Sequence, residues 1–322
     1  MKLSYLVIML VVFVTGLQAQ ITWDVSVKFI LDENGNRATS GNYTTDQEIL
    51  DSFDLANEQL AAMARGYEFE VIEIIDLPGV SEWFDSSCTS ADAGDLQAAA
   101  EADTAAFAWK TSAINVYVLG TDCSAVCSFP STGDIILVGQ GAALTSPFHE
   151  SGHFFDLCHT QGCSASDCDS TSDEIADTLP DASCWDQDGI AQESFGVDYD
   201  QLSTAQKDEV DDVWLNIMSY HNLNQRERLT PDQLDRLTDA SNIVRANVAS
   251  GQTWYVESGG FPGPMPFPFG LLADLPLDDL SDGLSAAAPK DVVLLRPGTY
   301  DAPSVIDQCV MLCASHGGVV LD

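Results

Sequence analysis

Basic residues are scarce in this chain of 322 residues. It has 12 lysines and arginines against 50 aspartates and glutamates, which gives a formal net charge of −38 at pH 7. A field of that sign repels phosphate backbones and anionic lipid headgroups, so it argues against nucleic-acid and anionic-membrane partners. Acidic clusters such as 208–212 lack the glycine and closing glutamate of an EF-hand. The acidic excess is therefore interpreted as a solvated surface adapted to salt or cold, in preference to a charge-selective binding surface.

Long apolar runs are missing beyond the N-terminus. The apolar stretch 6–14 follows a single lysine at position 2 and precedes the residues Thr-Gly-Leu-Gln-Ala. It is too short to span a bilayer, and polar sequence follows it at once. Residues 1–19 are therefore predicted to be a secretory signal peptide cleaved before Gln20. The residue directly after the cleavage site is Gln20 and not a cysteine, which argues against a lipoprotein anchor, so we expect a secreted protein without membrane insertion.

Paired C-x-x-C units, which are typical of cysteine zinc sites, are absent from the spacing of the nine cysteines. Cysteines of an exported protein form disulfides by default, so disulfides are favoured over a second zinc site. The odd number leaves at least one cysteine unpaired or paired between molecules. The nine are Cys88, Cys123, Cys127, Cys158, Cys163, Cys168, Cys184, Cys309 and Cys313.

Histidine is rare too, which makes its distribution informative. Three of the five histidines fall within the run 148–160, FHESGHFFDLCHT. His149 and His153 are four residues apart, so on a helix both imidazoles lie on one face and can bind one metal ion. Glu150 projects beside that pair, where it can take a proton from water held by the metal. His159 follows at the spacing of H-E-x-x-H-x-x-G-x-x-H, which favours a zinc protease over an exposed helix that carries histidines by chance.

The residues around this run support the helix that the metal site needs. Ser146 offers an N-cap hydroxyl and Pro147 a first-turn proline, while Phe148 and Phe155 can pack into a core. In the motif a glycine stands three residues before the third histidine, and this sequence has Asp156 at that position. Glycine would leave the helix in a left-handed conformation, and aspartate is among the few other residues that tolerate it, at a cost of about 1 kcal/mol. The returning turn is therefore feasible.

A methionine turn is expected downstream of such a motif, and the run 216–220, NIMSY, fits it. Met218 would pack beneath the metal site, and Tyr220 would reach toward the metal or the developing oxyanion. A methionine between apolar neighbours is ordinarily a core residue. Because Met218 follows a complete three-histidine motif, the interpretation that it belongs to the metal site is the better one.

These features together resemble the pappalysin-type metzincins, a group that includes the cytophagalysin-like secreted proteases of bacteria. HESGHFFDLCHT matches their zinc motif except at Asp156, and NIMSY matches their Met-turn. The run 173–178 resembles their cysteine-flanked acidic loop, and 229–233 resembles the start of their last helix. The match spans roughly Ile21 to Val248, and it is weak over the first hundred residues.

The resemblance implies a catalytic cofactor and its ligands. It implies that His149, His153 and His159 bind Zn²⁺ and that Glu150 is the general base. It implies a protein or peptide as substrate.

The resemblance also assigns supporting roles. Met218 would form the hydrophobic floor of the site, and Tyr220 would stabilise the transition state. Cys168 would pair with Cys184, and structural Ca²⁺ would lie near the acidic loop.

Strands alternate with helices along the chain, which predicts an α/β (α+β) fold. We expect a metzincin-like zincin catalytic domain with a mixed sheet and an active-site helix. The expected strands are 21–31, 67–77, 114–119 and 134–139, and the expected helices are 44–63, 95–110, 203–215 and 230–248.

The strand 134–139, DIILVG, comes just before the zinc helix and has two interpretations. In metzincins a strand at this place is the sheet edge that pairs with an extended substrate through backbone hydrogen bonds. The other interpretation is an ordinary buried strand. The sequence alone does not favour either one.

The C-terminal part has a different composition. The metalloprotease domain is predicted over 20–250, a Gly/Pro-rich linker over 251–270, and a small β-rich segment over 271–322. The segment should hold a short helix at 280–288 and short strands around the RPGTY turn, and it resembles the first coil of a right-handed parallel β-helix. Two rungs do not bury a solenoid core, so either the strands dock on the catalytic domain or the chain is a fragment of a longer protein. We expect the segment not to fold alone and its removal to spare hydrolysis.

Three functions are compatible with these features. The leading hypothesis is a secreted zinc metalloendopeptidase, in which water held by zinc and activated by Glu150 attacks the peptide bond. The alternative is a catalytically inactive metzincin scaffold that serves in binding or adhesion. The completeness of the site favours catalysis. A third, weaker hypothesis is a latent precursor in which Cys88 acts as a thiolate switch, although nothing around Cys88 resembles a switch motif.

Overall fold

A computed structural model describes residues 21–163, 173–262, 268–303, 305–306, 310–314 and 318–322. The expected signal peptide, 1–19, lies outside the described residues, and so does Cys168. In the described part of the chain, no helix combines the length and the apolar character needed to cross a membrane.

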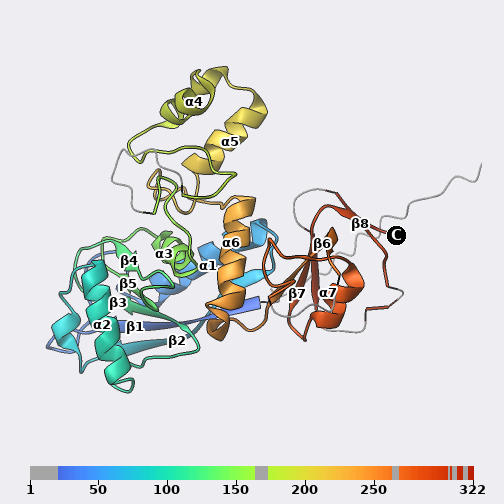
Figure 1. The fold of residues 1–322 in the computed structure, drawn as a ribbon. Coiled ribbons are helices and arrows are strands. Elements are labelled where there is room, and N and C mark those ends of the chain that lie inside the picture. Colours follow the sequence, from blue (N-terminus) through green and yellow to red (C-terminus); the bar gives the residue numbers. More distant parts are fainter. Residues whose placement is uncertain (1–20, 164–172, 263–267, 304, 307–309, 315–317) are drawn as a thin grey trace, which may run out of the picture.

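A five-stranded mixed sheet forms the centre of the N-terminal half, in the order β2-β1-β3-β5-β4 (Figure 1). Four strands run parallel to one another, and β4 pairs antiparallel with β5 at one edge. The mixed α/β class expected from the sequence is confirmed. The strands are β1 Ile21–Ile30, β2 Tyr67–Leu77, β3 Ile114–Val118, β4 Ala125–Cys127 and β5 Ile135–Val138.

Both faces of this sheet are covered by helices. Odd-numbered residues of β1, such as Trp23 and Val25, lie in one core with Phe53 of α1 (Asp46–Ala62). On the other face, Tyr117 packs in a second core with residues of α2 (Ser90–Ala102). Burial of these parallel strands on both faces explains why β5, IILV, is a continuous apolar run and why β3, INVYV, is apolar except at Asn115.

Capping residues set where these helices begin. Thr45 and Glu48 form the capping box of α1, so this helix begins at Asp46, two residues after the expected start at 44. The alanine-rich helix expected at 95–110 is shifted: it begins after Thr89, whose side chain accepts from the Asp92 backbone N–H. It ends at Ala102, since alanine content raises helix propensity but marks neither end.

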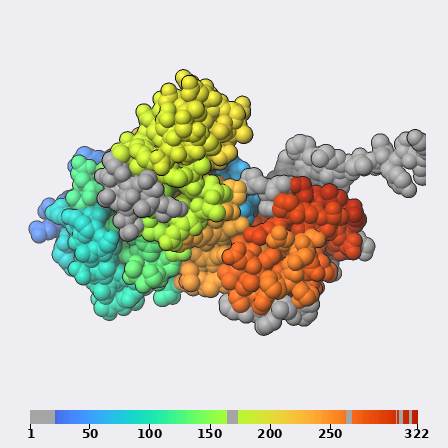
Figure 2. Space-filling model, turned by 45° about the horizontal axis from the view of Figure 1, so that its top comes forward, coloured from blue at the N-terminus to red at the C-terminus, as the bar shows by residue number. Residues whose placement is uncertain are grey.

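Between the helix of the HESGH run and the C-terminal part, the described residues form three further helices. The first two of them, with residues 187–214, pack on each other around a small core of their own, which we call the α4–α5 lobe. Figure 1 and Figure 2 show this lobe in yellow, standing above the rest of the molecule. The expected helix 230–248 ends earlier and continues as a separate 3-10 turn. The helices are α4 Gln187–Phe195, α5 Thr204–Trp214 and α6 Pro231–Ile243, and the 3-10 turns are η1 Ser81–Trp83, η2 Tyr199–Gln201 and η3 Ala246–Val248.

The C-terminal part consists of two small parallel sheets and one helix. One sheet has the order β6-β7-β9, and the other pairs β10 with β8. The parallel pairing of β7 with β9 and of β8 with β10 is what a solenoid coil requires, and the β-helix resemblance stays a prediction. The elements are β6 Thr253–Phe261, α7 Leu280–Ala286, β7 Val292–Leu295, β8 Gly298–Tyr300, β9 Met311–Ala314 and β10 Val319–Leu321.

Strand β6 lies inside the stretch expected to be a linker, 251–270. Its alternating TWYVE sequence buries Tyr255 and Val256 against different cores, which outweighs the glycines that follow. The division into a domain over 20–250 and a segment over 271–322 stays a prediction.

Of the two expectations for the C-terminal strands, the structure shows docking. Val292 and Leu294 of β7 lie in the same core as Trp23 of β1, and both are almost fully buried. Arg296, just after β7, pairs with Asp235 of α6 at 3.0 Å. Figure 2 shows the orange and red C-terminal part packed against the body of the molecule.

Candidate metal centre and active-site cleft

The metal motif lies on α3, Ser146–Phe154, a helix in which every residue is buried. Its N-cap is Thr145 rather than the expected Ser146, and no side chain caps the helix. The Thr145 hydroxyl instead donates to the Leu223 carbonyl at 2.5 Å, which connects the helix start to the segment after the Met-turn. Pro147 occupies the first turn as expected.

His149 and His153 project from one face of α3, and backbone carbonyls fix both rings. His149 Nδ1 donates to the Ile217 carbonyl at 2.7 Å, and His153 Nδ1 donates to the Leu157 carbonyl at 2.6 Å. With Nδ1 protonated by these contacts, each ring keeps the lone pair of Nε2 for a metal.

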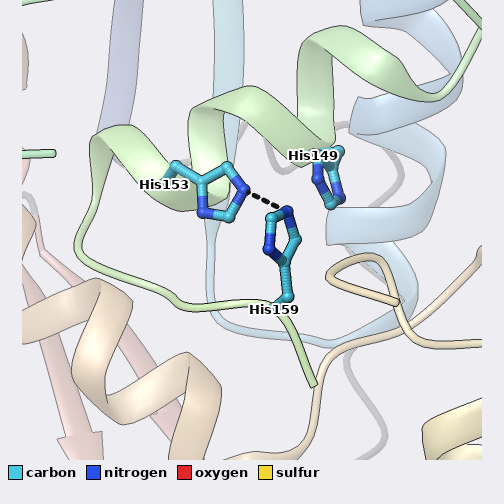
Figure 3. Close-up of side chains that lie close together, drawn as sticks. All are labelled: His149, His153 and His159. Carbon is cyan, nitrogen blue, oxygen red and sulfur yellow. Dashed lines mark hydrogen bonds between the residues drawn. The ribbon is translucent and has the colours of Figure 1, made fainter. Parts of the chain in front are cut away.

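The third histidine returns to the other two through a left-handed turn at Asp156, where φ is +71°. Figure 3 shows His159 on the loop below the helix, facing both other imidazoles. His153 Nε2 and His159 Nε2 are 2.9 Å apart, and one ligand nitrogen from each of the three rings lies within 4.8 Å of the others. The expected ligands are thus brought together.

The chemistry of these donors fits zinc. Burial lowers the pKa of His153 to about 4 and that of His159 to about 2, and it also lowers the pKa of His149 well below the usual range. All three imidazoles are therefore neutral at pH 7, which is the form that binds a metal. Three neutral imidazoles beside an open cleft are a donor set of catalytic zinc sites.

Glu150 lies in the same cleft, and its side chain is buried. Burial raises the pKa of its carboxyl to about 8, while the positive charge of Arg226 acts in the opposite direction. A carboxyl that titrates near neutrality can both accept and return a proton. Arg226 itself was not expected from the sequence, because its burial arises only in the folded chain.

Met218 packs directly under α3 and is fully buried. A Cβ placed on Gly152 would lie 2.3 Å from Met218 Sδ, so the glycine of the HESGH run makes room for the methionine. The Asn216 side chain accepts from the Met218 backbone N–H at 2.9 Å and shapes the turn.

Tyr220 borders the cleft and is 43% exposed. Its ring centroid lies 4.4 Å from that of His159 and 6.3 Å from that of His149. The phenol is therefore beside two of the three histidines.

A buried acid and histidine pair, which the sequence did not single out, supports the loop that carries His159. Asp181 accepts from His221 Nε2 at 2.8 Å and from the Thr160 hydroxyl at 2.5 Å. Thr160 directly follows His159, and its backbone N–H donates to the Met218 carbonyl at 3.3 Å. The pair thus ties the loop of the third ligand to the Met-turn.

The cleft has a volume of about 630 Å³, and strand β4 forms one of its walls. Of the two interpretations of 134–139, the ordinary buried strand is confirmed, because β5 has β3 on one side and β4 on the other. The free edge at the cleft belongs to β4 instead. The sequence did not reveal β4, since three residues are too few for a periodic pattern.

A disulfide contradicts the hypothesis that Cys88 acts as a thiolate switch. Cys88 forms a disulfide with Cys123, so it is not available as a thiolate switch. A second disulfide joins Cys158 to Cys163, within the loop that carries His159. Cys168 lies outside the described residues, so its pairing with Cys184 stays a prediction.

The carboxylates of the acidic loop contact the start of α6. Asp177 accepts from the Thr230 hydroxyl at 2.6 Å and from the Asp232 backbone N–H at 3.0 Å. Asp173 accepts from the Gln233 side chain at 3.3 Å. Among the described residues, the three histidines are the only group with metal-binding geometry, so the expected calcium near this loop finds no support.

Of the comparisons with known proteins, the one with solved structures found matches. No family model and no curated protein sequence matches the chain. One similar solved structure is mirolysin in complex with compound 9, with a TM-score of 0.47 and 18% identity, covering 70% of this chain and 95% of that one. Another is mature mirolysin of Tannerella forsythia in complex with a cleaved peptide, with a TM-score of 0.48 and 18% identity, covering 70% and 94%. The case for function therefore rests on the geometry of the site itself.

Proposed function

We propose that the chain is a secreted zinc metalloendopeptidase of the pappalysin-type metzincin kind. His149, His153 and His159 would hold the metal, and Glu150 would act as the general base. The observation that carries the proposal is the convergence of three neutral imidazoles and one buried carboxyl on a single cleft. When bound, zinc would lower the pKa of water and polarise the scissile carbonyl.

The residues of the chain would then do three things. Glu150 takes the proton of the attacking water and passes it to the nitrogen of the leaving amine, so the proton count balances. The Nδ1 contacts to Ile217 and Leu157 keep the two helix imidazoles oriented. Tyr220, beside the ligands, would donate to the oxyanion that forms as the carbonyl is attacked.

An extended peptide would bind along the free edge of β4. Within the part of the chain that the structure describes, residues 125–127 pair with β5 on one side only, and they border the cleft that contains Glu150. Backbone pairing at such an edge binds a peptide with little dependence on its side chains. This edge supports the proposal that the substrate is a protein or peptide.

The test combines metal content with hydrolysis. The purified mature protein should carry about one zinc per chain and should hydrolyse casein or gelatin until a chelator is added. Glu150→Gln keeps the shape and removes the base, so zinc should remain while activity falls by at least about a hundredfold. Glu193→Gln, on the exposed surface of α4, is the matched control and should change neither. Full activity in Glu150→Gln would contradict the mechanism, and zinc without hydrolysis in the unaltered protein would favour the inactive scaffold.

Secretion is tested separately. The N-terminus of the exported protein should be Gln20 or a residue next to it, because Ala19 ends the expected signal peptide. An exported protein that retains Met1 would contradict this part of the proposal.

A further inference from the structure

Arg226 is a buried cation in the candidate active site. Its side chain is only 5% exposed, and it lines the same cleft as Glu150 and the three histidines. Burial lowers the pKa of its guanidinium to about 10, and the negative charge of Glu150 acts against that shift. The side chain is therefore still positive at neutral pH.

Most of the hydrogen-bonding capacity of Arg226 is unused. A guanidinium has five N–H donors. Within the described structure Nη1 reaches the Ile217 carbonyl at 3.4 Å, a long contact, and Nε has no partner. A buried charged donor without an acceptor is costly, so an acceptor that binds in the cleft would remove this cost.

The other arginines show how unusual this is. The chain has many more carboxylates than cations, and each of the other six arginines pairs with at least one carboxylate. Among the described residues, Arg226 is the arginine without such a pair. The paired arginines are Arg37, Arg65, Arg228, Arg236, Arg245 and Arg296.

We propose that Arg226 binds a carboxylate of the substrate and makes the cleft selective for an acidic residue beside the scissile bond. This inference rests on the proposed peptidase function and adds a specificity to it. The free donors of the guanidinium match a carboxylate, which can accept two parallel N–H bonds. Leu223, 43% exposed, borders the same cleft, so the methylenes of an aspartate or glutamate side chain would have an apolar side chain to lie against.

The carboxylate that binds Arg226 can come from an acidic side chain or from the C-terminus of a peptide. Fluorogenic peptides with amidated C-termini isolate the first source. One series varies a single residue next to the scissile bond as Glu, Gln or Lys, and a second series presents a free C-terminus at the same place. We expect kcat/KM for the Glu peptide to exceed that for the Gln peptide by at least about tenfold, the ratio expected for one charge-assisted hydrogen bond. Preference for the free C-terminus alone would overturn the assignment to a side chain.

The variants separate recognition from a structural role. Arg226→Gln should bring the Glu-to-Gln ratio close to one while the Gln peptide is still cleaved. Arg228→Gln, two residues away and outside this cleft, is the matched control and should keep the ratio. If Arg226 only balances the charge of Glu150, Arg226→Gln slows all peptides by the same factor, and the proposal is wrong. A Glu-to-Gln ratio near one in the unaltered protein overturns it without any variant.

A second variant and a binding measurement separate this inference from misfolding and from the proposed peptidase function. Should Arg226→Gln not fold, Arg226→Lys keeps the charge but loses the planar fork, and we expect it to lower the ratio partially. The Glu150→Gln protein allows binding to be measured without turnover, and it should bind the Glu peptide at least about tenfold more tightly than the Gln peptide. Cleavage without a carboxylate preference defeats only this inference. Carboxylate-selective binding without any cleavage defeats the peptidase proposal and leaves Arg226 as a carboxylate site.

Discussion

Asp156, in a left-handed conformation, forms an ion pair with Arg236 of α6. The Arg236 Nη2 and Asp156 Oδ2 atoms are 3.1 Å apart, and φ at Asp156 is +71°. Glycine would adopt this conformation without strain, whereas the Asp156 side chain gains a partner on a neighbouring helix. Because both side chains are partly exposed, the pair contributes little more than about 1 kcal/mol, which is similar to the cost of the turn.

This relationship predicts a graded response at position 156. Asp156→Gly should leave zinc content unchanged and alter the free energy of unfolding by less than about 1 kcal/mol, since the strain and the ion pair disappear together. Asp156→Val should lower stability and zinc occupancy, because a β-branched residue at positive φ is strained. Chemical denaturation and metal analysis measure both. Equal stability in the glycine and valine variants would show that the turn does not depend on the left-handed conformation.

The third ligand itself is open to a direct test. His159→Ala should lose zinc and activity as completely as His153→Ala does, because two imidazoles hold zinc poorly at neutral pH. Asp156→Asn is the contrast: its carboxylate contacts Arg236 rather than the histidines, so the metal should stay bound. If His159→Ala keeps both zinc and activity, an acidic residue supplies the third ligand and the site has two histidines and one carboxylate.

Gly152 should not tolerate a methyl group. Alanine there would meet Met218 Sδ at 2.3 Å, and Met218 is fully buried and cannot move aside into solvent. We expect Gly152→Ala to lower the free energy of unfolding by about 1–3 kcal/mol and to reduce activity, since overpacking displaces the floor of the site. Gly94→Ala is the matched control, because nothing lies within 4 Å of its Cβ and it is in a helix. That change should raise stability by about 0.5–1 kcal/mol. Equal behaviour of the two variants would refute a packing role for Gly152.

Local signals predicted much of this architecture. The bounds of β2 and of α5 and the start of α6 agree closely with the sequence, because each depends on neighbours in the chain. The HESGH run likewise places two imidazoles on one helix face without further information. Such features need no knowledge of the distant chain.

Features that depend on contacts between segments far apart in the chain could not be predicted from the sequence. Strand β4 is visible only through its pairing with β5, and the burial of Arg226 arises from segments far apart in the sequence. Asp181 and His221 are 40 residues apart and meet only when the acidic loop folds onto the Met-turn. Neither residue has neighbours that distinguish it from a solvated polar residue.

Lys28 makes stability depend on pH. It is fully buried on β1, donates from Nζ to Asn115 Oδ1 at 2.6 Å, and burial lowers its pKa from 10.5 to about 7. Between these two values the unfolded chain binds more protons than the folded one, so the free energy of unfolding should rise with pH, by at most about 1.4 kcal/mol per pH unit. Below pH 7 both states are protonated, and the full cost of the buried charge is present.

Urea denaturation between pH 6 and pH 9.5 measures this dependence. Lys28→Met fills the same space without a charge, so the stability difference between Lys28→Met and the unaltered protein should shrink as pH rises. Parallel curves for the two proteins would show that Lys28 does not titrate in this range.

The shared core changes the expectation for the C-terminal segment. Deletion of 271–322 would expose the surface that Val292 and Leu294 cover, and each such side chain contributes about 1.5–3 kcal/mol by its burial. It would also leave Asp235 without Arg296. The deletion should therefore lower the melting temperature of the remaining chain. Hydrolysis should then be lost at a lower temperature than in the full chain, in contrast to the expectation that removal of the segment spares hydrolysis.

Two leucines of this segment provide a matched pair of point variants. Leu294, 1% exposed, faces the core shared with β1, whereas Leu321 on β10 is 46% exposed. Leu294→Ala should lower the free energy of unfolding by about 2–5 kcal/mol, because it leaves a cavity in a core common to both parts. Leu321→Ala should stay within about 0.5 kcal/mol of the unaltered protein. Chemical denaturation followed by casein hydrolysis at increasing temperature measures both effects. If Leu294→Ala and the deletion leave the unfolding transition unchanged, the C-terminal strands do not stabilise the domain that carries the site.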